Sequence, residues 1–187
     1  MFNINDNLVE NPVVAAIREE KDLDFVINSK VKIVFVLYGS IISAGVICKK
    51  LNDAGKVFFI HVDMIEGLKG DMAGLKFLKK NIGLEGILTT KTNIIRCSKQ
   101  LGFNTILRVF MLDSLSLKTG IKNIIDTNPD AVEIMPGMAS KIIPEMKKQV
   151  SIPIIAGGLI TQKNQVIEAL SDGAAAISTT CRQLWDL

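Results

Sequence analysis

The sequence has few aromatic residues, 5% in total, with one Trp and one Tyr among 187 residues. Proteins that read single-stranded RNA commonly stack bases on aromatic side chains, so the composition alone does not indicate RNA binding. The three cysteines, Cys48, Cys97 and Cys181, are far apart and form no CxxC pair. We therefore expect reduced thiols in a cytoplasmic protein, and neither a disulfide framework nor a zinc site.

Long apolar runs are also missing. Lys32 interrupts one of the richest apolar stretches, and His61 and Asp63 interrupt another. No segment reaches the roughly 20 apolar residues that a membrane helix needs. The N-terminus has no basic start followed by a long apolar run, so we expect no signal peptide. The formal net charge of +3 permits a nucleic-acid partner without requiring one.

The chain alternates short apolar runs with amphipathic stretches of helical period. Nearly continuous apolar strands that alternate with helices indicate a parallel sheet buried on both faces. Glycine stop signals and N-cap residues predict helices over residues 41–54 and 93–101, and another from an N-cap at Thr161 to Gly173. The expected strands are residues 13–17, 33–38, 57–63, 86–90, 105–112, 131–135, 152–156 and 174–178.

Two architectures fit this alternation, a closed (β/α)8 barrel and an open doubly wound sheet. The open dinucleotide-binding fold would carry a GxGxxG motif at its first strand. Residues 11–16 read Asn-Pro-Val-Val-Ala-Ala and contain no glycine. We therefore predict that residues 1–187 form a single α/β domain, a compact TIM-type barrel that is shorter than the usual length of about 250 residues.

The strongest local pattern lies near the C-terminus. One expected strand runs into the pair Gly157-Gly158, and the last strand runs into Ser178 and Thr179. In barrels the loops after the seventh and eighth strands often bind phosphate, because glycine backbone N–H groups and hydroxyls can approach its oxygens. The alternative is that the glycines only make a tight turn and Thr179 only caps a helix. We favour a phosphate site at these four residues.

Further polar residues mark the ends or the middle of other expected strands: His61, Asp63, Lys91, Arg108 and Glu133. Charges inside a parallel strand need partners, because an unpaired buried charge is very unfavourable. One interpretation is a structural layer of ion pairs, with His61 as a core histidine. The other is a ligand pocket in which the carboxylates accept ligand hydroxyls and the cations face anionic groups.

Evidence for catalysis is weaker. Asp63, Lys91 and Glu133 could supply acid–base or Schiff-base chemistry, as residues at barrel strand ends commonly do. The sequence shows no nucleophile–base spacing, and the two carboxylates of Asp63 and Glu66 are weak support for a magnesium site. We therefore assign no catalytic residue, no metal ligand and no redox cofactor.

The motifs together resemble the glycerol uptake operon antiterminator regulatory proteins. The resemblance runs from about Asn11 to Trp185, and two departures are Ser40 and Glu66, where the family tends to carry an acidic residue and Asp respectively. The segments that carry it are residues 38–39, 59–68, 88–91, 108–114, 133–137, 153–160, 178–180 and 184–185.

The resemblance implies a non-catalytic barrel that responds to glycerol 3-phosphate as its effector, binds the mRNA leader of a glycerol-utilisation operon and lets transcription pass a terminator. The alternatives are a phosphosugar-handling TIM-barrel enzyme and a metabolite sensor that acts through a protein partner. A homo-oligomer could widen the RNA footprint. The implied ligand face is Asp63, Lys91, Arg108, Glu133, Gly157, Gly158, Ser178 and Thr179.

Paired lysines on helical segments are the candidate RNA contacts. Each pair taken singly is better explained as a solvated helix face. Among Lys49-Lys50, Lys79-Lys80 and Lys147-Lys148, a single footprint could cover the first two pairs but hardly all three. Our prediction for RNA binding is therefore Lys49, Lys50, Lys79 and Lys80, contacting phosphates.

Overall fold

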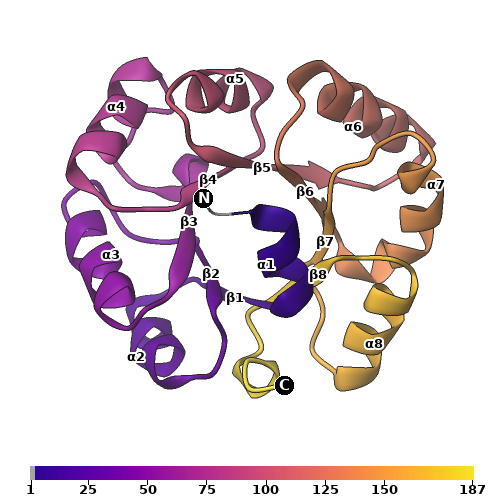
Figure 1. Cartoon of the computed structure of the whole chain (residues 1–187), viewed down its shortest axis with the longest axis horizontal. Helices are drawn as coiled ribbons and strands as arrows, with labels where there is room; N and C mark the ends of the chain where they lie inside the picture. The colour runs from indigo at the N-terminus through magenta and orange to yellow at the C-terminus, as the bar shows by residue number, and fades with distance from the viewer. Residues whose placement is uncertain (1–2) are drawn as a thin grey trace.

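A computed structural model describes residues 3–187; Met1 and Phe2, which the predicted domain includes, lie outside the described residues. The chain forms one closed barrel of parallel strands, β1 to β8 in chain order, which confirms the predicted fold (Figure 1). The strands are β1 (Val13–Ile17), β2 (Ile33–Val36), β3 (Val57–His61), β4 (Gly86–Thr89), β5 (Asn104–Phe110), β6 (Ala131–Met135), β7 (Ile154–Gly157) and β8 (Ala176–Thr179).

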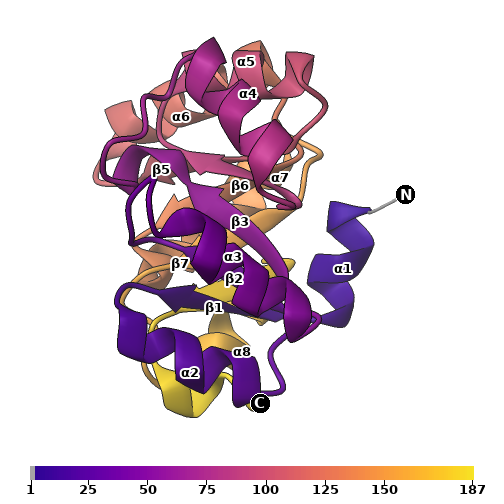
Figure 2. The same ribbon diagram turned by 90° about the vertical axis from the view of Figure 1, so that its left-hand side faces the viewer.

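Helices surround the barrel, and α1 instead lies across one of its openings (Figures 1 and 2). After β8 the chain makes only a short 3-10 turn, η3 (Arg182–Leu184), in the gap between α8 and α2. No helix within residues 3–187 is long and apolar enough to cross a membrane. The helices are α1 (Ile4–Glu10), α2 (Glu20–Asn28), α3 (Ala44–Asp53), α4 (Met72–Asn81), α5 (Thr92–Gln100), α6 (Ser114–Thr127), α7 (Ile143–Lys147) and α8 (Lys163–Ser171).

The barrel interior is apolar near the starts of the strands. Successive residues of a strand point to opposite faces, so Val14 and Ala16 of β1 point inward while Val13 and Ala15 pack against the outer helices. Ile4 and Leu8 of α1 join the inner cluster and close this end of the barrel. Because α1 closes the end where the strands begin, the open end of the barrel is the one where the strands finish. The sequence analysis did not predict α1, which is short and mostly polar.

Several predicted boundaries were wrong, and two of them affect the site. The strand predicted over residues 57–63 ends at His61, and the 3-10 turn η1 (Val62–Met64) carries Asp63 out of the sheet. Thr161 is not the N-cap of α8. Gln162 holds that position, and the Gln165 side chain accepts hydrogen bonds from the N–H groups of Thr161 and Gln162.

Candidate ligand-binding pocket

A buried ion pair forms the floor of the open end. Arg108 on β5 and Glu133 on β6 are direct partners in the parallel register of the two strands. The Arg108 Nε donates to Glu133 Oε2 at 2.5 Å, and the Ser178 hydroxyl on β8 donates to Glu133 Oε1 at 2.5 Å. All three residues are buried. The predicted pairing of the strand-interior charges is therefore present, and it links three strands.

Only glycine fits at position 157, because its backbone lies directly against this floor. A Cβ atom at Gly157 would collide with the Glu133 carboxylate and the Ser178 hydroxyl. Gly158 follows with φ +78°, a conformation that side chains rarely adopt, and a Cβ atom there would lie 2.6 Å from Met135 Cε. Gly157 thus permits the ion-pair network, and Gly158 permits the turn beside the open cavity.

A cavity of about 570 Å³ lies above the floor. Its size is in the range of small-molecule sites, and it has an apolar rim over a polar base. Five of the predicted site residues line it, namely Arg108, Glu133, Gly158, Ser178 and Thr179. The apolar rim is formed by Leu37, Met64, Phe110, Leu112, Met135, Pro136, Leu159 and Ile160.

Arg18 and Thr180 are lining residues that the sequence analysis missed. Arg18 follows β1 directly, and its exposed side chain also borders a second hollow of about 730 Å³ that adjoins the cavity. Within residues 3–187 its guanidinium has no ion-pair partner, and the Thr180 hydroxyl has no hydrogen bond. Arg18 could have been predicted from the sequence. In a closed barrel β1 pairs with β8, so the residue after β1 lies beside the predicted phosphate site after β8.

Thr179 lines the cavity, but its hydroxyl is already used. It donates to the Ile160 carbonyl at 2.6 Å and accepts from the Cys181 N–H at 2.9 Å. The Trp185 indole donates to the Thr179 carbonyl at 3.0 Å. These bonds hold the β7 and β8 loops together, so the hydroxyls of Thr161 and Thr180, which also line the cavity, are the ones without a hydrogen bond within residues 3–187.

Gly157 does not line the cavity, and the other three predicted residues, His61, Asp63 and Lys91, form a second cluster outside it at the ends of β3 and β4. Asp63 Oδ2 accepts from the Thr89 hydroxyl at 2.7 Å and from the Thr90 N–H at 2.9 Å. The Lys91 ammonium lies 3.2 Å from Asp63 Oδ1, and His61 Nδ1 lies 3.8 Å from Asp63 Oδ2. Asp63 therefore anchors the loop between β4 and α5.

Burial and neighbouring charges hold this cluster in defined protonation states. Burial lowers the pKa of His61 to about 4, and the Arg108 charge adds to the effect. Burial alone would raise the pKa of Asp63, but the Thr90 N–H, the Thr89 hydroxyl and the Lys91 ammonium bring that pKa below its ordinary value. His61 is thus neutral and Asp63 ionised near pH 7.

Within residues 3–187 no three His, Cys, Asp or Glu side chains are placed to hold a metal ion.

The lysines predicted for RNA lie away from the cavity, on the outer surfaces of α3 and α4. Lys49 pairs with Asp53 at 2.7 Å, and the Lys79 ammonium lies 4.8 Å from the centre of the Phe103 ring. Lys50 and Lys80 are exposed.

The fold and the pocket define a class: closed parallel α/β barrels with a polar-floored pocket at the carboxyl ends of the strands. Residues 13–185 match the model of the family described as "Glycerol-3-phosphate responsive antiterminator". The chain belongs to this family. It is also 36% identical over 180 residues to the protein YgcP of Escherichia coli K12, covering 96% of this chain and 94% of YgcP.

Two similar solved structures have related descriptions. The glycerol uptake operon antiterminator regulatory protein of Listeria monocytogenes superposes with a TM-score of 0.88 at 31% identity, covering 92% of this chain and 94% of that chain. A glycerol uptake operon antiterminator-related protein of Thermotoga maritima gives a TM-score of 0.83 at 31% identity, covering 94% and 98%. More distant barrels, such as an N-acetylmannosamine-6-phosphate 2-epimerase at 14% identity, share the fold alone.

Proposed function

We propose that this protein is a transcription antiterminator that binds the mRNA leader of a glycerol-uptake operon in response to glycerol 3-phosphate. The observation that carries the proposal is the family match across residues 13–185. Such a regulator acts on nascent transcripts and therefore works in the cytoplasm. The cavity supplies a place for the effector, and no catalytic step is needed.

We infer that the effector's phosphate binds near Gly158, Thr180 and Arg18. Gly158 gives close access to backbone N–H groups, Thr180 offers a free hydroxyl, and Arg18 brings an uncompensated positive charge. The glycerol hydroxyls then face Arg108. Its ion pair with Glu133 uses only Nε, so the terminal guanidinium nitrogens remain available as donors.

The response is a linkage between two binding sites. If glycerol 3-phosphate binds one conformation of the protein better, and that conformation binds RNA better, each ligand strengthens the other by the same factor. The loop that joins β5 to α6 is one physical connection, because Phe110 and Leu112 line the cavity and Asp113 caps α6. Effector binding therefore acts on an element that reaches the outer surface.

Transcription in vitro tests this proposal. A template that carries a glycerol-uptake operon leader and its terminator is transcribed with the protein present, with and without glycerol 3-phosphate. We expect read-through to rise when protein and effector are both present, and glycerol or inorganic phosphate alone to serve as negative controls. Read-through that does not change in any combination would contradict the proposal.

An enzyme acting on a small phosphorylated substrate is the second candidate. Lys91 and Asp63 follow the ends of β4 and β3, and the Lys91 Nζ lies 3.2 Å from Asp63 Oδ1, as in a pair that could carry out acid–base chemistry. Incubation with triose, glycerol and pentose phosphates distinguishes the two. We expect no product from any of them. Turnover that Lys91→Ala abolishes would make the enzyme the better account.

A further inference from the structure

Positive charge is concentrated in one sector of the barrel. From the start of α4 to the end of α6, residues 72–127 contain nine Lys or Arg and three Asp or Glu, a net charge of +6. The rest of the chain contains thirteen basic and sixteen acidic residues, a net charge of −3, which together give the +3 of the whole chain. The modest overall charge therefore hides a strongly basic third of the sequence.

Five of these nine basic residues lie on one surface, whereas Arg108 is buried in the pocket floor and Lys91 is paired with Asp63. The helices α4, α5 and α6 are neighbours along one side of the barrel (Figures 1 and 2). Lys76 and Lys80 on α4 are one helical turn apart, as are Lys118 and Lys122 on α6, and Arg96 lies on α5 between them. All five side chains are exposed. We call these five residues the α4–α6 basic surface.

The members of this surface are free to bind a partner. Lys49 on α3 is paired with Asp53, Lys79 lies over Phe103, and Lys99 is held by Asn128 and Asp130. The five residues of the α4–α6 basic surface have no ion pair or hydrogen bond from their side chains within residues 3–187. These five side chains are therefore available for contacts with a partner.

An exposed aromatic ring lies within the same surface. Phe77 on α4 is 37% exposed and lies one helical turn from Lys80. A ring beside uncompensated lysines matches what single-stranded nucleic acid needs, since phosphates take the cations and a base stacks on the ring. An acidic protein partner could also pack against the ring, so RNA is preferred here because the proposed function supplies it.

We propose that the leader RNA docks on the α4–α6 basic surface, with Phe77 as a stacking platform for an unpaired base. This inference rests on the proposed function and adds where the RNA binds. It keeps Lys80 from the sequence prediction and moves the footprint from α3 toward α5 and α6. The RNA then contacts α6, whose capped start adjoins the cavity rim.

The test measures binding of a labelled glycerol-uptake operon leader transcript to the native protein and to the variants below, at saturating glycerol 3-phosphate and several salt concentrations. Lys76→Glu/Lys80→Glu and Lys118→Glu/Lys122→Glu should each weaken binding by roughly tenfold or more, because phosphate contacts are lost. Removing two contacts should also reduce the slope of log affinity against log salt by about 1.4 for single-stranded RNA.

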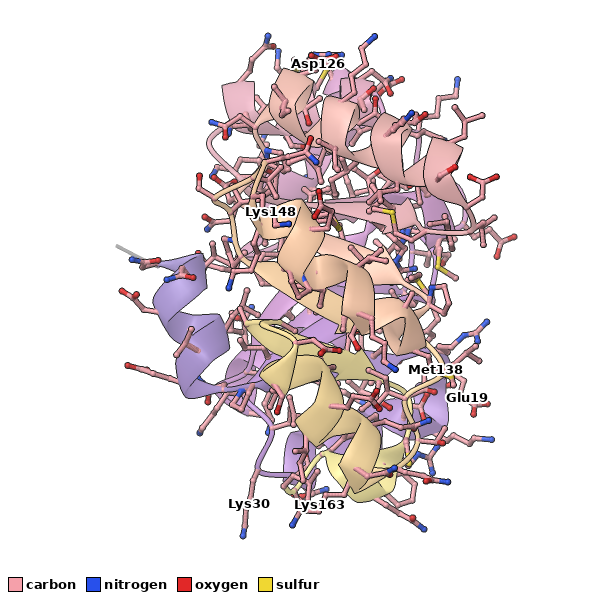
Figure 3. The ribbon with its side chains drawn as sticks, turned by 90° about the vertical axis from the view of Figure 1, so that its right-hand side faces the viewer. Glu19, Lys30, Asp126, Met138, Lys148 and Lys163 are labelled. Carbon is pink, nitrogen blue, oxygen red and sulfur yellow. The ribbon has the colours of Figure 1, made fainter. Side chains whose placement is uncertain are left out.

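The matched control is Lys30→Glu/Lys163→Glu, which makes the same change in charge. Figure 3 shows Lys30 and Lys163 at the end of the molecule opposite Asp126 of α6. We expect this variant to bind RNA within about twofold of the native protein. Circular dichroism and thermal unfolding establish that every variant is folded.

The aromatic platform has a control of its own. Phe77→Ala should weaken RNA binding roughly fivefold or more without changing the salt slope, because base stacking is lost and no phosphate contact is. Phe25→Ala removes an exposed ring on α2, where Phe25 lies 4.0 Å from the Arg182 guanidinium, and should leave RNA affinity unchanged.

The outcomes separate this inference from the function on which it rests. If the native protein binds the transcript and both helix variants bind it equally well, the surface is wrong and the antiterminator function stands. An equal loss in the Lys30/Lys163 control would also overturn the surface, since binding would then follow net charge alone. If the native protein binds no RNA at low salt, with or without effector, both proposals fail.

Discussion

The two polar clusters at the carboxyl end of the barrel differ in what they leave unbonded. In the first, Arg108 uses only its Nε for Glu133 and faces a cavity with its remaining donors. In the second, Asp63 Oδ2 is bonded to Thr89 and Thr90, Oδ1 has only the Lys91 ammonium at 3.2 Å, and the buried His61 Nδ1 has no hydrogen bond within residues 3–187. Neither His61 nor Asp63 lines the cavity. From this comparison we expect a charged residue at a strand end to mark a ligand site only where donors or acceptors remain free beside an opening.

The largest expected effect is a loss of stability when the Arg108–Glu133 ion pair of the first cluster is broken. Glu133→Ala leaves the buried Arg108 guanidinium without its partner, so we expect the free energy of unfolding to fall by about 3–5 kcal/mol. Urea denaturation measures this change. The control is the triple variant Arg108→Met/Glu133→Leu/Ser178→Ala, which removes both charges and the hydroxyl that donates to Glu133, and should be close to neutral. A loss below about 1 kcal/mol in Glu133→Ala would mean that the pair does not hold the strands.

The next effect concerns the ligand. Arg18→Ala removes an exposed guanidinium from the cavity wall without touching the floor, so folding should be unaffected. Hydrogen bonds to charged groups contribute about 1.5–3 kcal/mol, so glycerol 3-phosphate affinity should fall roughly 10- to 100-fold by calorimetry. The matched control is Lys21→Ala, because Lys21 is an exposed cation that borders the adjacent hollow but is already paired with Glu19. Equal affinities for Arg18→Ala and Lys21→Ala would remove Arg18 from the site.

The pH dependence of stability tests the second cluster, which contains His61 and Asp63. The pKa of His61 is lowered to about 4 in the folded protein, so the unfolded chain binds more protons between about pH 6.5 and pH 4. Stability should therefore decline as the pH falls through that window, by about 1–3 kcal/mol. The lowered pKa of Asp63 adds a further loss only below its ordinary value near pH 4. His61→Gln should flatten the upper window, and an unchanged slope there would contradict this role.

The smallest effect is expected at Lys91. Its side chain is 60% exposed, so Lys91→Ala should lower the free energy of unfolding by less than about 1 kcal/mol. Because Lys91 does not line the cavity, glycerol 3-phosphate affinity should stay within about threefold of the native value. A large loss of affinity, comparable with that of Arg18→Ala, would extend the ligand site to the second cluster.

The strands and the barrel could be predicted because β-branched apolar runs alternate with helical stretches, and that pattern survives small boundary errors. The pairing of Arg108 with Glu133 was also foreseeable, since both charges lie inside consecutive strands and need partners. The role of Gly157 was not, because its contact with Glu133 depends on the register between β6, β7 and β8. A glycine pair looks the same in a sequence whether it meets phosphate or a carboxylate.

The division into two clusters could not be predicted either. His61 and Asp63 share a local spacing with many strand-end pairs, and only the turn η1 shows that Asp63 bends toward β4. The α4–α6 basic surface was hidden for a different reason. Pairs of adjacent lysines are conspicuous in a sequence, whereas Lys76 and Lys80 of α4, Arg96 of α5, and Lys118 and Lys122 of α6 share one side only because these three helices pack next to one another.

Coupling between effector and RNA is the most direct test of the account. Calorimetry measures glycerol 3-phosphate affinity for the protein alone and for the protein saturated with leader RNA, while the affinity for RNA is measured with and without effector. The account predicts that RNA tightens effector binding by the same factor by which the effector tightens RNA binding. Effector affinity that is identical with and without bound RNA would contradict it.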